Sequence, residues 1–535
     1  MDRKRFALYT VVIGAFVGVI GDLLFFGKAI GISFPLFLLI LIVLVLASQG
    51  LMRQTIHPRQ LWPLIPALFF GCMVAVRADA GINTLNVMAA FALCLLALHY
   101  MPGSRPIDLD ATADHIFSTL EATFGTLLAP LFEVFDSIGW CVERLTGHGR
   151  VIMSVGRGLA ITAPIVLIFG VLLASADAVF AGYADRIVSF LRFPQFSNEV
   201  ILQIVMIGGI GWVACGALAY GVGRRMRAED RAEKPKRKLP SLGLIEGCIA
   251  LGSIDLLFGL FVIIQFAYFF DGRTTLAISG MTYADYARSG FFELVAVSVL
   301  TLAFVLALDA MTVRARQRHT RLFQVLSLIL VALTGVILVS ASQRMLLYED
   351  QYGFTMLRVD THVFMYWLAV LFIFFVLALF RVRRRVFSLG LLIVLIGYVG
   401  TLNLMNVQGY ITERNIARAA EGREVDFYYL LQFSEDAEPA MLHMYQTTNS
   451  QTLRTASGQW LAHMLMQLDS LRAMGTDSTI FSANLARDSA WASLNAVRAS
   501  LPTFDPSHYY YYAVVAASDD SQQQGSSYHG DDMTG

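Results

Sequence analysis

Long apolar stretches recur about eleven times along this chain of 535 residues. A helix needs about 20 consecutive apolar residues to cross the hydrocarbon core of a membrane, which is about 30 Å thick. Only 15% of the residues are charged, whereas a soluble domain averages about 25%. We predict an all-α fold, a polytopic transmembrane helix bundle with spans at residues 6–26, 32–51, 60–76, 82–100, 157–176, 199–222, 244–270, 291–311, 322–342, 361–380 and 386–405.

Lysines and arginines crowd alternate gaps between these stretches. One set of gaps holds 24 of them, around residues 3–5, 53–59, 105–150, 224–238, 314–321 and 381–385, and the other set holds 8. Basic residues in short loops stay on the cytoplasmic side of a membrane. We therefore predict a multi-pass protein of the cell membrane with a cytoplasmic N-terminus. The odd number of spans then puts the region after residue 405 outside the cytoplasm.

The composition divides the chain into five parts. Residues 1–222 hold the N-terminal spans and an amphipathic cytoplasmic helix near residues 112–146, and residues 244–405 hold the C-terminal spans. The basic residues 223–243 form a linker, and topology alone explains their charge, so we expect no nucleic acid partner. Helical apolar periodicity predicts a small extracytoplasmic helical domain at residues 406–504. A polar, low-complexity tail at residues 505–535 is predicted to be disordered.

Motifs of soluble enzymes are absent from the sequence. It has no phosphate-binding glycine loop, no His-Glu-x-x-His helix and no Cys-x-x-Cys pair, and its five cysteines all precede residue 249. We expect no cofactor and no bound metal, and we assign no catalytic residue. Small residues within spans, namely Gly14, Gly18, Gly208, Gly209 and Gly211, predict close helix contacts.

Asp255 is an acidic residue near the middle of a predicted span, at residues 244–270. An acidic residue at mid-membrane costs about 2.5–3.5 kcal/mol on insertion scales, so we expect it to face the bundle interior. Two interpretations stay open, a structural hydrogen-bonded carboxyl and an ion-coupling group. Gln265, about three turns later, is either a second lining residue or a helix–helix hydrogen bond.

Two predicted exterior stretches combine carboxylates with arginines and tyrosines. Tyr283, Asp285, Tyr286, Arg288 and Glu293 lead into one span, and Tyr348, Glu349, Tyr352, Gly353 and Arg358 lead into another. Such groups bind polar headgroups or substrates through charge-assisted hydrogen bonds. Tyrosine belts and arginine anchors at the membrane interface are the alternative interpretation.

The same stretches resemble an uncharacterised family of bacterial polytopic membrane proteins, the domain of unknown function 4173, with a related 4153 group. The matching segments are Asp255–Gln265, Tyr283–Leu294, Tyr352–Arg358, Asn415–Arg418, Val425–Leu430 and Ser434–Ala440. The resemblance covers roughly residues 240–500, and it departs at Phe270-Asp271-Gly272, where the family more often has glycines after the phenylalanine. It implies a membrane-embedded fold and carries no known activity.

Three functions fit the sequence. The first is an envelope accessory, sensing or scaffolding protein whose functional face lies outside, with the lipid bilayer and an envelope protein or lipid as partners. The second is a small-molecule or ion transporter that uses Asp255. The third is a membrane enzyme that acts on lipid or cell-wall precursors through Asp285, Arg288, Glu349 and Arg358. We rank the accessory protein first because no catalytic or ion-relay pattern is recognisable.

Overall fold

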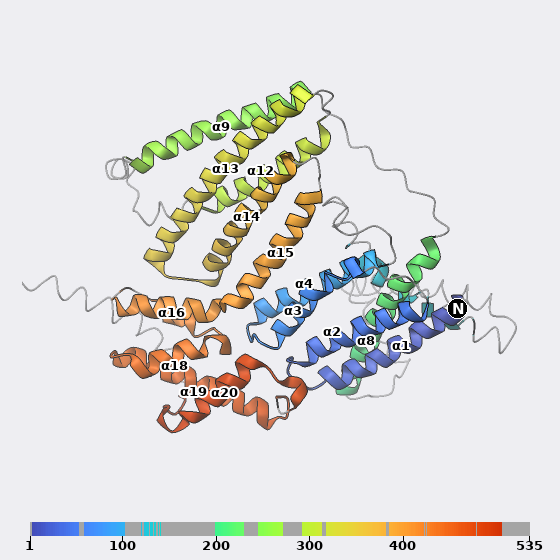
Figure 1. The fold of residues 1–535 in the computed structure, drawn as a ribbon. Coiled ribbons are helices and arrows are strands. Elements are labelled where there is room, and N and C mark those ends of the chain that lie inside the picture. The colour runs from blue at the N-terminus through green and yellow to red at the C-terminus, as the bar shows by residue number, and fades with distance from the viewer. Residues whose placement is uncertain are drawn as a thin grey trace, which may run out of the picture.

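The structure is a computed structural model. It describes residues 3–52, 58–101, 198–228, 244–270, 291–312, 317–380 and 385–505 except 422, 424 and 478, with scattered residues between 119 and 140. Every regular element in these residues is a helix (Figure 1). The predicted span at 157–176 and nearly all of the tail at 505–535 lie outside the described residues, as does most of the predicted helix near 112–146.

The apolar helices form two groups. The first holds α1 (Arg3–Phe25), α2 (Ser33–Leu51), α3 (Leu64–Val74), α4 (Ala80–Tyr100) and α8 (Asn198–Ala228). The second holds α9 (Leu244–Phe270), α12 (Phe291–Met311), α13 (Gln317–Tyr352), α14 (Met356–Phe380) and α15 (Arg385–Met405). The groups meet where α15 lies against α3 and α4. There, apolar side chains line a groove of about 460 Å³ that includes Met88, Leu93, Leu392 and Leu395.

Seven of these helices are long and apolar enough to cross a membrane: α1, α2, α4, α8, α13, α14 and α15. The chain is therefore membrane-embedded, and the count of about eleven spans stays a prediction. The segment predicted as a span at residues 60–76 contains α3, which has 11 residues and reaches only about 16 Å. Helix α8 continues to Ala228, so the predicted linker at 223–243 begins inside a helix.

Glycines allow α1 and α8 to approach closely, as the sequence predicts for Gly14, Gly18 and Gly211. A Cβ atom on Gly14 would lie 2.7 Å from Cβ of Cys215, and one on Gly18 would collide with the carbonyl oxygen of Ile207. For Gly208 and Gly209 no atom of the described residues lies within 4 Å of such a Cβ, so a close contact at these two positions stays a prediction.

Gly18→Leu is expected to lower the free energy of unfolding by at least about 1–3 kcal/mol, because its side chain must push α8 away. Gly208→Leu is the matched control, since no described residue has an atom within 4 Å of a Cβ at this position. Thermal unfolding of the full chain in detergent compares the two variants. Equal midpoints for both would contradict the close packing of α1 on α8.

Helices α16–α20 form a unit that we call the cap, and the bundle end that they contact is the capped end. They are α16 (Val407–Ala420), α17 (Phe427–Leu430), α18 (Glu438–Thr447), α19 (Gln451–Ala473) and α20 (Leu485–Ala496). Trp460 lies at the centre of the cap, buried among Phe427, Leu430, Met441 and Leu461. This core continues into Ile82, Val359, Val363 and Leu402 of the bundle. The cap thus packs directly onto the bundle.

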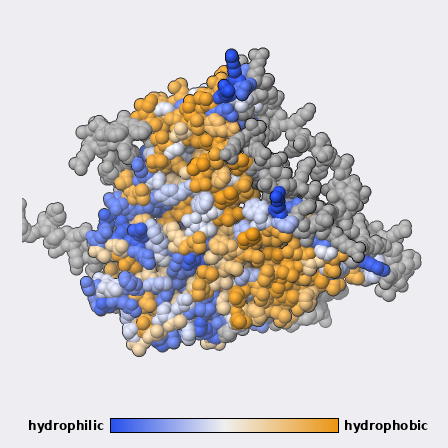
Figure 2. All heavy atoms as spheres, in the orientation of Figure 1, coloured by the Kyte–Doolittle hydropathy of each residue, from blue (hydrophilic) through white to orange (hydrophobic). Residues whose placement is uncertain are grey.

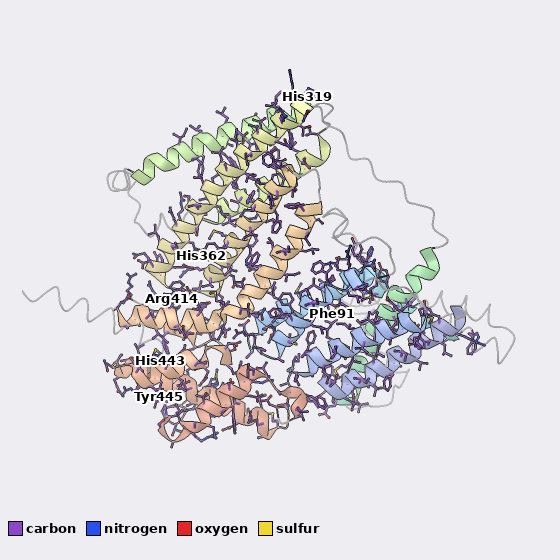
Figure 3. All side chains as sticks on the ribbon, viewed as in Figure 1. Phe91, His319, His362, Arg414, His443 and Tyr445 are labelled. Carbon is purple, nitrogen blue, oxygen red and sulfur yellow. The ribbon has the colours of Figure 1, made fainter. Side chains whose placement is uncertain are left out.

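Polar and apolar surfaces separate along the molecule. Figure 2 shows hydrophobic side chains over the bundle and hydrophilic ones over the cap. His319, at the start of α13, lies at the end of the second group that is farthest from His443 of the cap (Figure 3). The N-terminus of α1 also lies away from the cap. We call the end of the bundle opposite the cap the basic end, because Arg5, Arg318 and Arg321 occur in the helix turns that begin there.

Candidate functional site at the capped end

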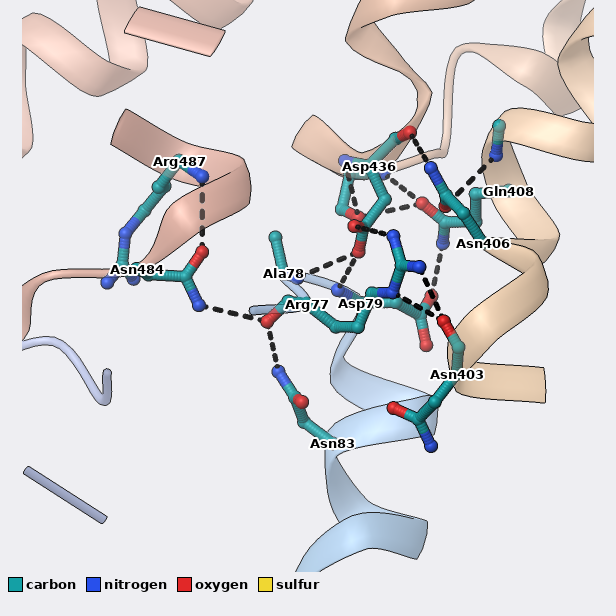
Figure 4. Close-up of polar contacts among 12 residues, drawn as sticks. Arg77, Ala78, Asp79, Asn83, Asn403, Asn406, Gln408, Asp436, Asn484 and Arg487 are labelled. Atoms are coloured by element: carbon teal, nitrogen blue, oxygen red, sulfur yellow. Dashed lines mark hydrogen bonds and ion pairs between the residues drawn. The ribbon is translucent and has the colours of Figure 1, made fainter. Parts of the chain in front are cut away.

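Asp436 is the centre of a buried polar junction between the cap and the bundle (Figure 4). Its residue is 3% exposed. The carboxylate accepts hydrogen bonds from the backbone N–H groups of Ala78 at 2.7 Å and Asp79 at 2.8 Å, and it pairs with Nη1 of Arg77 at 3.4 Å. These donors all belong to the loop between α3 and α4. A carboxylate satisfied in this way holds the loop and the cap together.

Arg77 extends the junction to the second helix group. Its Nε and Nη2 donate to the carbonyl oxygen of Asn403, near the end of α15, at 2.8 and 2.5 Å. The side chains of Asn403 and Asn86 exchange two hydrogen bonds of 2.6 and 2.9 Å. One guanidinium therefore contacts the α3–α4 loop, α15 and the cap.

Local sequence explains how these groups are placed. Asp79 caps the N-terminus of α4 by accepting from the N–H of Ile82 at 2.6 Å. Asn406 adopts a left-handed conformation, with φ of 51°, at the corner between α15 and α16, and asparagine tolerates this region better than most residues. The second carboxylate oxygen of Asp79, Oδ2, accepts a hydrogen bond from Nε2 of Gln408 in α16. Oε1 of the same Gln408 amide accepts from the backbone N–H and the hydroxyl of Ser434, both at 2.7 Å.

A second contact joins the cap to the corner between α13 and α14. The amide of Asn415, in α16, accepts from the N–H of Phe354 at 2.8 Å and donates to its carbonyl at 2.9 Å. Arg418 of α16 donates to the carbonyls of Asp350 and Gln351 at the end of α13. Helix α16 thus closes the C-terminus of α13, where carbonyl groups lack helical partners.

The structure brings Glu349, Tyr352 and Arg358 together at this corner. Arg358 donates to the carbonyls of Tyr352 and Gly353, and its guanidinium lies 4.2 Å from the ring centroid of Tyr348. Arg358 therefore serves as a C-terminal cap of α13. Glu349 is buried and pairs with Nδ1 of His362 at 3.3 Å.

Asp255 is the one other predicted site residue whose side chain falls within the described residues. Asp255 is in the middle of α9, and no hydrogen-bond partner for its two buried carboxylate oxygens occurs among the described residues. It follows Leu251 by one turn on the side of α9 that packs against α13. Gln265 and Glu293 belong to α9 and α12, and their side chains are outside the described part, as are Tyr283, Asp285 and Arg288.

Sequence reasoning missed Arg77, His362 and the role of Asp436. Arg77 and Asp436 are 359 positions apart, so no local pattern links them. The segment Ser434–Ala440 did carry a signal, since it belongs to the resemblance. In the part of the chain that the structure describes, no three His, Cys, Asp or Glu residues are grouped to hold a metal.

Glu438 gives the cap a measurable pH dependence. Burial raises the pKa of its carboxyl above the usual 4.5, and a hydrogen bond from the hydroxyl of Ser493, at 2.6 Å, opposes part of the increase. The folded cap therefore binds this proton more tightly than the unfolded chain. Its stabilising effect is complete below pH 4.5 and is lost as the pH rises through the raised pKa. The free energy of unfolding, measured between about pH 4 and 8, should change less with pH in Glu438→Gln than in the unsubstituted protein.

Residues 64–444 match the model of a family described as Domain of unknown function (DUF4153). No curated protein and no solved structure matches the chain. The match confirms the related group named in the resemblance, whereas membership of the 4173 family itself stays a prediction.

Proposed function

The chain belongs to the family of the domain of unknown function 4153, and we propose that it is an integral membrane accessory protein that holds a rigid helical cap at the outer surface of the cell membrane. In this proposal the cap is a scaffold for an envelope partner. The observation that carries it is the Asp436 junction, which fastens the cap to both helix groups through buried hydrogen bonds.

The distribution of charge supports an outward position for the cap. The arginines at the basic end occupy the side that the positive-inside rule assigns to the cytoplasm. The cap lies at the opposite end. In this proposal the N-terminus is cytoplasmic and residues 406–504 are extracytoplasmic.

The rim of the cap supports contact with the membrane surface. Ile480 is 75% exposed and Met474 is 71% exposed. Ile480 lies within, and Met474 just before, the segment 476–483, whose ends accept backbone hydrogen bonds from the α1–α2 loop, Thr476 from Ala29 and Ala483 from Ile32. Lys28 of that loop lies over the ring of Phe481. Exposed apolar residues beside a lysine suit the boundary between acyl chains and headgroups.

Cysteine labelling in intact cells tests the outward cap. Met466, on α19, is 48% exposed, and Arg318 lies in the first turn of α13 at the basic end. We expect a membrane-impermeant maleimide to label Met466→Cys in intact cells and Arg318→Cys only after permeabilisation. The chain without an added cysteine provides the background. The reverse labelling pattern would overturn the proposed orientation.

Photo-crosslinking tests the scaffold role. A photoreactive residue at Met466 should give a discrete protein adduct in intact cells, and Asp436→Ala should abolish the adduct by releasing the cap. The same residue at Leu395, which is 54% exposed on α15, serves as the control in the membrane. An adduct that persists unchanged in Asp436→Ala would contradict the requirement for a fastened cap.

Asp255 supports a second candidate function, transport of an ion or a small molecule. Its carboxylate is buried without a partner among the residues described around α9, and such a group inside a membrane marks ion pathways in many transporters. Flux into proteoliposomes that carry the purified protein should then fall in Asp255→Asn. Flux that is absent, or unchanged by this substitution, would exclude the transporter.

A further inference from the structure

We propose that Ser342, His362 and Glu349 form a serine hydrolase site that cleaves an ester of a membrane lipid, and that a groove between α13 and α14 holds its acyl chain. This activity goes beyond the scaffold role and does not depend on a partner of the cap. Figure 3 shows His362 between α13 and α14, in the part of the bundle nearer to the cap.

The three side chains form a continuous hydrogen-bonded chain. Oγ of Ser342 lies 3.0 Å from Nε2 of His362, and Nδ1 of His362 lies 3.3 Å from Oε1 of Glu349. An ionised carboxylate only accepts hydrogen bonds, so it places the imidazole proton on Nδ1 and leaves Nε2 to accept from the serine. Nucleophile, base and orienting carboxylate are in the order that a serine hydrolase requires.

Burial and stacking fix the base. Glu349 and His362 are both buried, and the imidazole stacks on Tyr366 with 5.4 Å between ring centroids and 12° between planes. A base held on one side by a carboxylate and on one face by a ring keeps its orientation toward the serine.

The Ser342 hydroxyl differs from three other hydroxyls of α12 and α13. Ser298, Thr301 and Thr334 donate to the carbonyl four residues earlier, which satisfies them within their own helix. Ser342 instead meets the imidazole of the neighbouring helix. Its proton is therefore directed to a base.

An apolar groove of about 680 Å³ runs along the faces of α13 and α14 that carry these residues. On α13 its lining includes Val331, Gly335 and Val339, which precede Ser342 by 11, 7 and 3 residues and share its helical face. On α14 it includes Ala369, Ile373 and Val376, which follow His362 by 7, 11 and 14 residues and share its face. The lining residues nearest to the site are Val339, about one turn before Ser342, and Ala369, about two turns after His362, so the groove runs from the serine toward the basic end.

The position and surface of the groove suit an acyl chain. Val339 is 59% exposed and Ile373 is 60% exposed, so the groove opens at the surface of the bundle. Ser342 precedes the end of α13 by 10 residues, or about 15 Å of helix, which places it toward the boundary where lipid ester groups lie. A chain in the groove would bring its ester to Ser342.

The reaction is hydrolysis with water as the second substrate. Oγ of Ser342 bonds to the ester carbonyl carbon as its proton passes to Nε2 of His362. The bond from that carbon to the alcohol oxygen then breaks, and the alcohol leaves with the proton from Nε2. Water attacks the acyl-serine, gives one proton to His362 and releases the carboxylic acid, and the proton returns to Oγ. The sum is ester plus water to acid plus alcohol.

A fluorophosphonate probe, which reacts with activated serines, tests the nucleophile in the purified full-length protein. We expect labelling at Ser342, identified by peptide mass spectrometry and abolished in Ser342→Ala. The labelling rate should fall by about 10²–10⁴-fold in His362→Ala, because the general base is lost. It should fall at least about tenfold in Glu349→Gln, which cannot hold the imidazole in the same tautomer. Ser340→Ala, two residues away on another face of α13, should label normally.

Esters of graded chain length test the groove. No atom of the described residues lies within 4 Å of a Cβ added at Gly335, so Gly335→Leu should fold normally and fill the groove. We expect kcat/KM for a twelve-carbon p-nitrophenyl ester to fall about 10–200-fold more than kcat/KM for the four-carbon ester. Folded protein that shows no labelling at Ser342, or labelling that His362→Ala does not slow, would overturn the proposal and leave the three residues as helix–helix hydrogen bonds. Probe labelling and ester hydrolysis do not depend on whether the cap binds a partner. The hydrolase proposal and the scaffold proposal can therefore be rejected independently of each other.

Discussion

Asp436→Ala is expected to lower the free energy of unfolding by about 3–5 kcal/mol, because it removes one partner of a buried ion pair and leaves the other charged. Nη1 of Arg77 and the N–H groups of Ala78 and Asp79 all lose their acceptor. Unsatisfied donors of this kind cannot find water in a closed junction. The cap should therefore separate from the bundle before the spans unfold. Limited proteolysis of the full chain in detergent should cut the cap at a lower protease concentration than in the unsubstituted protein.

Asp350→Ala is the control for Asp436→Ala. Asp350 pairs with Arg423 at 2.5 Å, but both side chains are about half exposed. Exposed ion pairs contribute about 0–1 kcal/mol to the free energy of unfolding. The Asp350→Ala chain should therefore be cut at nearly the same protease concentration as the unsubstituted protein. If the two variants were equally resistant to the protease, the Asp436 junction would stabilise the cap no more than a surface ion pair does. The proposal that this junction fastens the cap would then be wrong.

Trp460→Ala is expected to lower the free energy of unfolding by about 3–5 kcal/mol through loss of packing. Trp460 is 2% exposed and is the largest fully buried side chain of the cap. Its indole N–H also donates to the carbonyl of Leu431 at 3.1 Å, which joins α19 to the end of α17. Alanine leaves a cavity between α17, α18 and α19 that these helices cannot close without moving. Thermal unfolding should show the cap transition at a markedly lower temperature.

Met466→Ala provides the matched comparison on the same helix. Its side chain is 48% exposed, so truncation removes little buried area, and surface changes usually stay within about 0.5 kcal/mol. The unfolding temperature of Trp460→Phe should lie between those of Trp460→Ala and Met466→Ala, because phenylalanine keeps most of the ring volume but loses the hydrogen bond. A Trp460→Ala midpoint equal to that of Met466→Ala would contradict a packed cap core.

The seven long apolar helices were predictable from sequence because a membrane imposes a length and an apolar composition on every crossing. The ends of α13 were harder to predict. The apolar pattern suggests 322–342, whereas the helix runs from Gln317 to Tyr352, since the turns beyond the apolar stretch are stabilised by Arg358 and α16. The cap helices carry ordinary amphipathic patterns, and their N-caps at Asp426, Ser450 and Asn484 follow local rules.

The candidate site was only partly predictable. Glu349 and Arg358 stand out as charged residues beside a span, but the role of Arg358 as a helix cap depends on the turn at Gly353. His362 reads as part of an apolar run, and its partners Ser342 and Glu349 become neighbours only when α13 and α14 fold into a hairpin. The junction of Arg77 with Asp436 needs the whole bundle, because it joins the first third of the chain to the cap.

The fastening of the cap to both helix groups limits how these groups can move relative to each other. Near the capped end, Arg77 and the Asn86–Asn403 pair join the α3–α4 hairpin to α15. The apolar groove between α4 and α15 can therefore widen most easily toward the basic end, with the capped end acting as the pivot. A rocking motion that alternately opened both ends would have to break these hydrogen bonds in every cycle.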